Sequence, residues 1–263
     1  MNRRIKWVIV ATTLSLLATR AFAFDVPFAG EAPVVDGDAG DTAWAQAKWV
    51  PMENLMWGTL PGKDDFSGRY KLVWTQDHLY LLAEITDDIL YDSHPDPLEF
   101  YWEDDALEIF IDADASGGDH LHNYNAFAYH ISLDNQAADI GPFLSEEDRQ
   151  TNNVNVRLFP GHVQSQWKRS QDEPNTIYWE VKITVMGDDF QDSYTAGQKA
   201  AQAVVLQAGQ KMGFMLAYCD SDGMTEGRGR EHFMGDVDVK PVNGDRNLGY
   251  INASVFGEIT LVQ

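Results

Sequence analysis

The 263-residue sequence predicts an all-β protein: a single antiparallel β-sandwich of the jelly-roll or immunoglobulin-like kind, with long loops and one short inserted helix. Three observations predict this fold. Most of eight candidate segments show β-branched or aromatic residues with period two, which is typical of strands that turn one face to a core. Gly, Asn, Asp and Pro separate these segments. No helical crossovers connect them, so we expect antiparallel pairing.

The first 23 residues predict a secretory signal peptide. Three basic residues occur within the first six, an apolar run follows from Trp7 to Thr19, and Ala21 and Ala23 place small residues before the expected cleavage. This run is shorter than the roughly 20 residues that span a bilayer. We therefore expect residues 24–263 to form one domain of a secreted or periplasmic protein, without membrane insertion.

The composition is strongly acidic. The sequence has 41 Asp and Glu against 19 Lys and Arg, and four of the basic residues lie in the predicted leader, so 15 against 41 leaves a charge of −26 for the rest. Such a surface repels nucleic acid and anionic lipid and suits calcium or neutral sugars, or simply a salty environment. The single cysteine, Cys219, excludes an internal disulfide, and its apolar surroundings favour a core position.

The strand predictions follow the alternation along the chain. In order they are Arg69–Trp74, Leu79–Thr86, Leu107–Asp112, Ala126–Leu133, Val154–Phe159, Ile177–Val185, Met212–Tyr218 and Gly257–Val262. The inserted helix is expected at Gln198–Gln207. Residues 51–67 and 140–153 are predicted to be long irregular loops, which in compact domains are usually functional or mobile.

One stretch, residues 101–120, carries the main functional signal. Leu107, Ile109 and Ile111 alternate with Glu108, Phe110 and Asp112, so Glu108 lies on the face opposite the aliphatic side chains. Trp102 precedes this strand in a proline-containing loop, where a core position is not expected. An aromatic ring beside a carboxylate suits a sugar, whose ring face is apolar and whose rim carries hydroxyls.

Several motifs, taken together, resemble the family 9 carbohydrate-binding modules and, more broadly, the sandwich superfamily that includes haem-binding DOMON-type domains. They are PVVDGDAGDTAW (33–44), LVWTQDHLYLLAEITDD (72–88), WEDDALEIFIDAD (102–114), YWEVKITV (178–185), GFMLAYCDSDG (213–223) and FGEITL (256–261).

The resemblance implies a non-catalytic β-sandwich that binds oligo- or polysaccharide chain ends between two aromatic side chains, with structural calcium. It places Trp102 at one stacking position and Glu108 at the strand carboxylate that accepts sugar hydroxyls. The family's arginine would fall in 127–130, where the chain has FAYH, and its second tryptophan in 231–235, where only Phe233 is aromatic. A changed specificity and a lost site are both open, and extracellular glycoside hydrolases are the expected protein partners.

Other residues are candidates to complete this site. His130 alternates with the core residues of its strand and is expected to form hydrogen bonds to the ligand. Arg228 and Arg230, in a glycine-flanked turn, are the cationic donors near Phe233, although a solvated turn is the alternative. Trp57 and Trp167 are two further candidates for the second aromatic position.

Two acidic segments resemble the start of a calcium loop, where alternating oxygens surround the ion and glycine permits a sharp bend. The first contains Asp112, Asp114 and Asp119, and the second contains Asp220 and Asp222. Ordinary Asp-Gly turns without an ion are the alternative reading.

Two other functions remain open from the sequence. One is haem binding for electron transfer, with Met212, Met215, Met224, Met234 and histidines as possible axial ligands. The other is a glycoside-active enzyme, although the sequence carries no serine-hydrolase elbow, zinc-protease helix or phosphate loop.

Overall fold

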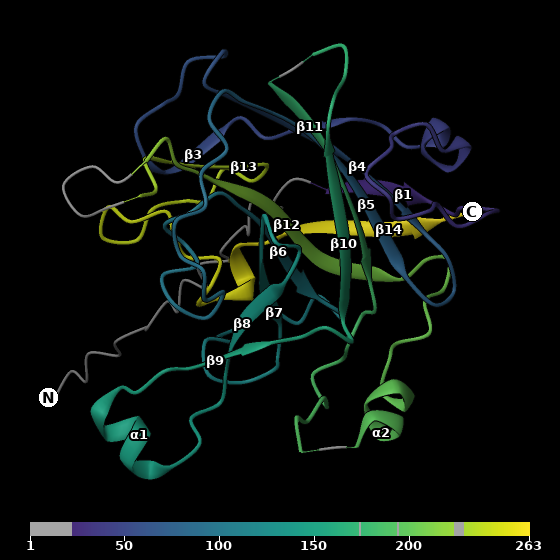
Figure 1. Cartoon of the computed structure of the whole chain (residues 1–263). Coiled ribbons are helices and arrows are strands. Elements are labelled where there is room, and N and C mark those ends of the chain that lie inside the picture. Colours follow the sequence, from purple (N-terminus) through teal and green to yellow (C-terminus); the bar gives the residue numbers. More distant parts are fainter. Residues whose placement is uncertain (1–22, 174, 194, 224–228) are drawn as a thin grey trace, which may run out of the picture.

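The computed structural model describes residues 23–173, 175–193, 195–223 and 229–263, and its strands form two packed sheets (Figure 1). The larger sheet has the order β1 (Ala23–Pro27), β14 (Gly257–Val262), β12 (Lys211–Asp220), β6 (Ala106–Asp112), β7 (Phe127–Ser132), β8 (Ala137–Gly141) and β9 (Asn155–Leu158). Two more of its strands, β13 (His232–Gly235) and β3 (Asn54–Gly58), extend from β12. The smaller sheet has the order β10 (Val163–Arg169), β11 (Thr176–Ile183), β5 (Leu79–Asp87), β4 (Phe66–Trp74) and β2 (Val50–Pro51).

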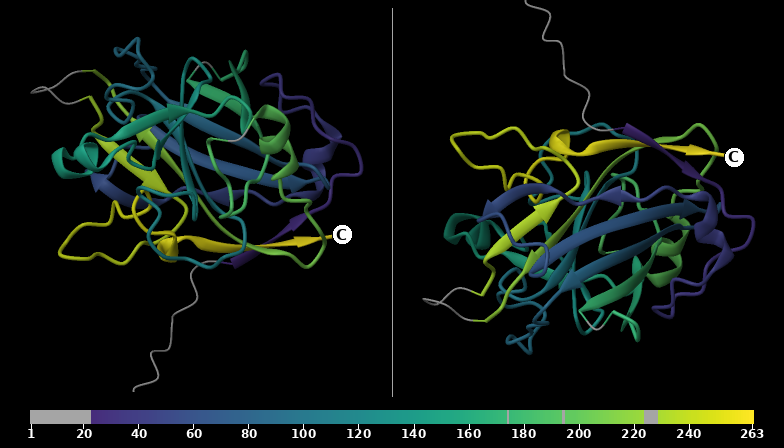
Figure 2. Two further views of the ribbon diagram at one scale, coloured as in Figure 1. Left: turned by 90° about the horizontal axis from the view of Figure 1, so that it is seen from below. Right: turned by 90° about the horizontal axis from the view of Figure 1, so that it is seen from above.

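The fold is the predicted all-β sandwich, with one departure from antiparallel pairing. All eight predicted strands are present within a few residues of their expected ends. The pairs between named strands are antiparallel except that of β1 with β14, which is parallel. Figure 2 shows these two strands side by side near the C-terminus.

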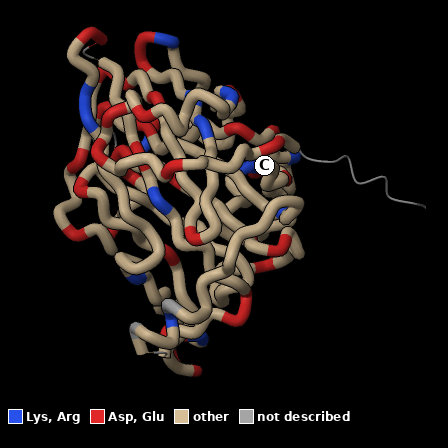
Figure 3. Tube along the Cα trace, turned by 90° about the vertical axis from the view of Figure 1, so that its right-hand side faces the viewer, with Lys and Arg blue, Asp and Glu red and all other residues tan. Residues whose placement is uncertain are grey.

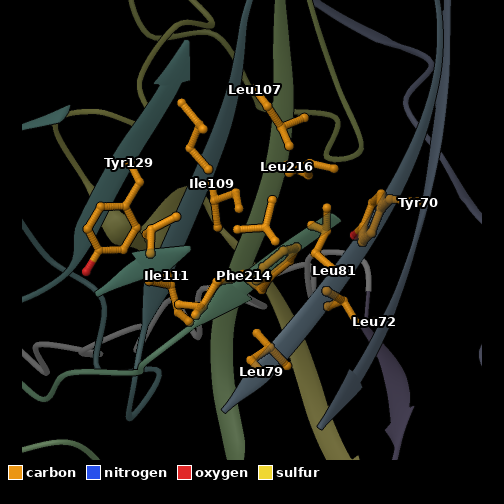
Figure 4. Packing of buried hydrophobic residues seen from close by; sticks show 14 of the residues in the cluster. Tyr70, Leu72, Leu79, Leu81, Leu107, Ile109, Ile111, Tyr129, Phe214 and Leu216 are labelled. Carbon is orange, nitrogen blue, oxygen red and sulfur yellow. The ribbon is translucent and has the colours of Figure 1, made fainter. Parts of the chain in front are cut away.

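The main core lies between the sheets and contains the aliphatic side chains that the alternation assigned to it. Leu107, Ile109 and Ile111 of β6 face Leu72 of β4 and Leu81 of β5, and these side chains are essentially inaccessible to solvent (Figure 4). The tryptophans expected to pack, Trp44, Trp74 and Trp179, are also buried.

The opposite face of β6 is covered as well. Phe110 packs there with Met215, Phe233 and Phe256 in a second cluster of buried side chains. Glu108 therefore lies on a largely apolar face. Burying its ionised carboxylate there is costly unless it has a charged partner, hydrogen bonds or access to solvent. Cys219 belongs to this second cluster, as its apolar surroundings predicted.

The loops differ in detail from the prediction. The predicted helix 198–207 is shorter, as α2 spans Ala196–Ala201, and Ala203 instead forms a bridge with Met186. The stretch 140–153 contains α1 (Glu146–Thr151), whose N-terminus is capped because Ser145 accepts a hydrogen bond from the Asp148 amide. The stretch 51–67 contains β3. Two 3₁₀ helices, η1 (Thr42–Gln46) and η2 (Ala253–Val255), complete the elements.

Acidic residues are spread over the surface and outnumber basic ones on the face shown in Figure 3. Among the described residues, no helix is both long and apolar enough to cross a membrane.

Candidate functional site

A cavity of about 650 Å³ opens over the outer face of the larger sheet. Glu108 of β6 and Ala128 and His130 of β7 line it from the sheet, and the loop 98–102, between β5 and β6, lines it from above. Arg230, which precedes β13, closes one end. The strand residue Glu108, the loop residue Trp102 and the distant Arg230 thus meet at one place.

The polar part of this cavity is centred on the carboxylate of Glu108. His130 Nε2 lies 2.7 Å from Glu108 Oε1, because the two residues are directly paired across β6 and β7. The Cys219 thiol donates to the same oxygen at 3.0 Å, and Arg230 Nη1 lies 3.8 Å from it. These contacts with described residues all converge on Oε1, so Oε2 is the oxygen available to a ligand.

Glu108 is held in its charged form. Burial by itself would raise the pKa of Glu108, but the charges and hydrogen bonds of His130, Arg230 and Cys219 outweigh burial and lower it below its usual value. The result is a buried, ionised acceptor with the Arg230 guanidinium and the His130 imidazole beside it. Such a group forms strong hydrogen bonds to hydroxyls.

Arg230 is fixed in place by aromatic rings and by Glu103. Its guanidinium lies 4.8 Å from the ring centroid of Phe233 and 5.1 Å from that of Trp57. Glu103 Oε2 accepts hydrogen bonds from the backbone amides of Gly229 and Arg230 at 2.8 and 3.3 Å. The donor is therefore preorganised, with little conformational freedom to lose on binding.

Trp102 is joined to the same anchor. Its indole Nε1 donates to Glu103 Oε1 at 3.0 Å, its ring makes an edge contact with Tyr101, and 36% of the residue is exposed. Tyr101 in turn contacts His130 edge-on, at 4.7 Å between ring centroids. The indole is thus held over the cavity and remains partly open to solvent.

The far end of the cavity is aliphatic. Ile140 of β8 and Val156 of β9, which are paired, line it with Val154. Asp139 also lines this end, where its carboxylate accepts hydrogen bonds from the amides of Ala128 and Ile140 at 3.0 and 2.7 Å. Burial raises the pKa of Asp139 to about 7, in spite of these two hydrogen bonds. The cavity is therefore lined by both charged and aliphatic side chains.

The structure brings together four of the six residues expected at the ligand site: Trp102, Glu108, His130 and Arg230. Phe233 requires a correction, because it is fully buried and supports Arg230 from beneath instead of facing the cavity. It packs in the second cluster with Phe110 and Met215, which excludes solvent from its ring. Arg228 lies outside the described residues.

The two tryptophans considered for the second aromatic position do not line the 650 Å³ cavity. Trp167 packs against the main core and donates its indole N–H to Leu133 O at 2.8 Å. Trp57 lines a separate cavity of about 500 Å³ and contacts Arg230 from the side of the second cluster.

A second polar feature is a buried acidic cluster close to the end of β12. One carboxylate oxygen from each of Asp87, Asp105 and Asp220 lies within 4.8 Å of the others, and all three residues are buried. Both oxygens of Asp220 are buried without a hydrogen-bond partner. Burial and the neighbouring charges raise the pKa of Asp220 to about 8. An unpaired carboxylate in such a place is costly unless a cation compensates it.

The acidic cluster continues toward the surface. Asp65 groups with Asp220 and His232, and also with the exposed pair Asp88 and Asp222. These residues offer carboxylate oxygens, which are the ligands that calcium prefers. The donor set therefore fits a hard cation, and the two sequence candidates Asp220 and Asp222 belong to it.

The other predicted metal ligands are placed differently. Asp112 accepts hydrogen bonds from the amides of Asp114 and Gly117 at 3.3 and 2.7 Å, and Asp114 accepts one from Ser116 at 3.0 Å. Asp119 accepts a hydrogen bond from Asn252 at 2.9 Å. Within the described part of the chain these three do not gather around one point, and their bonds are those of an aspartate turn.

The described methionines that the sequence offered as haem ligands are core residues. Met212, Met215 and Met234 are buried in the two core clusters, and none of them lines the 650 Å³ cavity. Met224 lies outside the described residues.

Several site residues had no signal in the sequence. Glu103, Asp139 and Phe100 line or support the cavity, and Asp87 and Asp105 complete the acidic cluster, yet each reads locally as a strand-end or loop residue. One signal in the sequence could have indicated them: the acidic run 103–105 directly precedes the strand that carries Glu108.

Comparison with known proteins yields a consistent set of relatives. The family model described as "Carbohydrate family 9 binding domain-like" matches residues 35–263. The fold is similar to a carbohydrate-binding module family 9 protein from Caldicellulosiruptor kristjanssonii, solved with cellotriose (TM-score 0.60, 19% identity, 92% of this chain and 94% of that one). The same module with glucose gives a TM-score of 0.59, with 19% identity over 90% of this chain and 95% of that one.

Among curated proteins, the chain is 25% identical over 149 residues to endo-1,4-beta-xylanase A of Thermotoga neapolitana, covering 55% of this chain. It is also 25% identical over 159 residues to endo-1,4-beta-xylanase A of Thermoanaerobacterium saccharolyticum, covering 60% of this chain. The matched regions are only 13% and 12% of those enzymes.

Proposed function

Because this chain belongs to the carbohydrate family 9 binding-domain-like family, we propose that the cavity over β6 and β7 binds a neutral saccharide without catalysing a reaction on it. The observation that carries this proposal is the convergence of Trp102, Glu108, His130 and Arg230 on one cavity of about 650 Å³. That volume lies within the usual range for small-molecule sites.

Each of these side chains has a role that suits a sugar. The indole of Trp102 stacks against the C–H face of a pyranose, and Glu108 Oε2 accepts a hydroxyl hydrogen. Arg230, which lines the same cavity 3.8 Å from Glu108 Oε1, donates to the sugar in the role that the sequence resemblance assigned to an arginine at 127–130. A charged acceptor beside charged donors binds hydroxyls in either direction, since each hydroxyl both donates and accepts.

The charge of the cavity supports a neutral ligand over an anionic one. Among the described residues, the carboxylates of Glu99 and Glu108 line it beside the guanidinium of Arg230 and the imidazole of His130, and Asp139, whose pKa is raised to about 7, lines it as well. The chain as a whole carries a formal charge of −22. An anionic sugar would approach against this field and meet a guanidinium already engaged with Glu108.

A structural calcium ion is the second part of the proposal. Asp87, Asp105 and Asp220 would hold it, with Asp65, Asp88 and Asp222 forming a neighbouring acidic group. The ion would neutralise carboxylates that burial otherwise forces toward the protonated form. The unpartnered, buried Asp220 supports this placement over the Asp112 turn, where backbone amides already occupy the oxygens.

The context of the relatives supports a role in polysaccharide breakdown. The two curated relatives named above are xylanases, and the matched part of this chain corresponds to about an eighth of their length. We infer that the protein is exported by its leader and binds oligo- or polysaccharide outside the cytoplasm, alongside glycoside hydrolases that supply the chemistry.

The test is calorimetric titration with glucose, cellotriose and xylotriose, in calcium and in excess chelator. Glucuronic acid serves as the matched anionic sugar and should bind more weakly than glucose. Leu144→Asn is the control variant, because Leu144 is 73% exposed and does not line the cavity. If none of these saccharides binds in either buffer, and a wider panel of glycans also fails, the assignment is wrong.

A further inference from the structure

Phe100 lies at the edge of the cavity in an unusual conformation. Its residue is 54% exposed, it lines the cavity, and its backbone φ is +53°. Left-handed backbone is uncommon for residues other than glycine and is a marked outlier for a bulky side chain. Because about half of Phe100 stays exposed, burial compensates the strain of this conformation only in part.

The surrounding loop holds Phe100 in this conformation. The Glu103 amide donates to the Phe100 carbonyl at 2.8 Å. Farther back, Asp104 accepts hydrogen bonds from the hydroxyl of Ser93 and the amide of His94, both at 2.9 Å. The ring of His94 then lies 5.3 Å from that of Phe100. The loop is therefore built to present this ring and does not leave it free.

Phe100 and Trp102 form one wall of the cavity. Their ring centroids are 5.9 Å apart and their planes meet at 59°. A sugar between two rings needs about twice the 3.5–4.0 Å contact distance of carbon atoms, so this pair is too close to enclose one. The rings can both contact a ligand only from the same side. Ile140 and Val156 add aliphatic side chains to the lining of the same cavity.

We propose that Phe100 is the second aromatic contact of the saccharide, adjacent to Trp102 on the same loop. The inference depends on the proposed function, because it assigns a further residue to that same site. It accounts for the absence of an exposed aromatic side chain on β13, where Phe233 is buried. Both of these aromatic contacts then come from one loop, and the aliphatic side chains of Ile140 and Val156 and the ring of Tyr250 complete the lining of the cavity.

The experiment compares three variants with the parent protein by titration with cellotriose and xylotriose. Phe100→Asn removes the ring but keeps a residue that tolerates left-handed backbone, so the melting temperature should be unchanged or higher. Its affinity should fall about tenfold. Phe100→Tyr keeps the ring and should stay within about twofold of the parent. Leu144→Asn, the matched exposed control, should not change affinity.

The outcomes separate the two proposals when Trp102→Ala is included. If Trp102→Ala weakens binding but Phe100→Asn stays within twofold of the parent, the inference is overturned and the proposed function stands. A tenfold loss in Phe100→Tyr also overturns it, because a retained ring should retain the contact. If the parent binds no saccharide, both proposals are lost.

Discussion

Replacing Trp102 by alanine is the most direct perturbation of the proposed site. About 36% of Trp102 is exposed. For a side chain of roughly 250 Å², this leaves about 90 Å² that a ligand can cover. At about 25 cal/mol per Å², covering this area contributes about 2 kcal/mol, so Trp102→Ala should weaken saccharide binding roughly 30-fold.

The assay is isothermal calorimetry with cellotriose, together with a melting curve to show that the fold is intact. Trp102→Phe is the informative second variant, because it keeps an aromatic face but loses the N–H that donates to Glu103 at 3.0 Å. If stacking dominates, Trp102→Phe should retain most of the affinity.

Two results would refute this reasoning. Unchanged affinity in Trp102→Ala would show that the indole does not contact the ligand. An equal loss in Trp102→Phe and Trp102→Ala would show that the hydrogen bond to Glu103, which positions Arg230, matters more than the aromatic face.

Three further predictions concern the buried charges. Excess chelator should lower the melting temperature by about 5 °C, the scale expected for losing a bound ion at about 100 times its Kd; Asp114→Asn should keep this response and Asp220→Asn should abolish it. In chelator, the free energy of unfolding should rise by about 4 kcal/mol from about pH 8 to about pH 6, because burial raises the pKa of Asp220 to about 8 and of Asp139 to about 7. Over this range the native chain holds protons that the unfolded chain has released, so stability is lost as pH rises. A free energy of urea unfolding that does not change between about pH 6 and about pH 8 would contradict the raised pKa values of these two aspartates. Glu108→Gln should cost about 3 kcal/mol in urea unfolding, since it leaves the buried guanidinium of Arg230 without its carboxylate; a cost below about 0.5 kcal/mol would mean that the charges of Glu108 and Arg230 are not coupled.

The strand pattern could be predicted because alternation is a local property. Leu107, Ile109 and Ile111 had to share one face of β6, and they form part of the core between the sheets. Glu108 and His130 could likewise be placed on the opposite face of their strands. Their direct pairing depends on the register of β6 with β7, which the alternation alone does not give.

The helix and the acidic loops were predicted less well, because short segments are decided by their surroundings. The sequence around Ala203 has helical composition, but the residue pairs with Met186 as a β-bridge instead. Asp112 and Asp220 both begin calcium-like motifs. Only the structure shows that backbone amides satisfy the first and that the second is left without a partner.

The sequence by itself determined the sandwich, its core strands and the pairing of an aromatic loop residue with a strand carboxylate. Tertiary structure alone decided that Arg230 reaches Glu108 across 122 positions of chain, that Phe233 is buried beneath it, and that Asp87, Asp105 and Asp220 meet. The physical reason is that hydrophobic alternation is written into neighbouring residues. A polar site is instead assembled from strand ends and loops, whose distances are set only when the sheets pack.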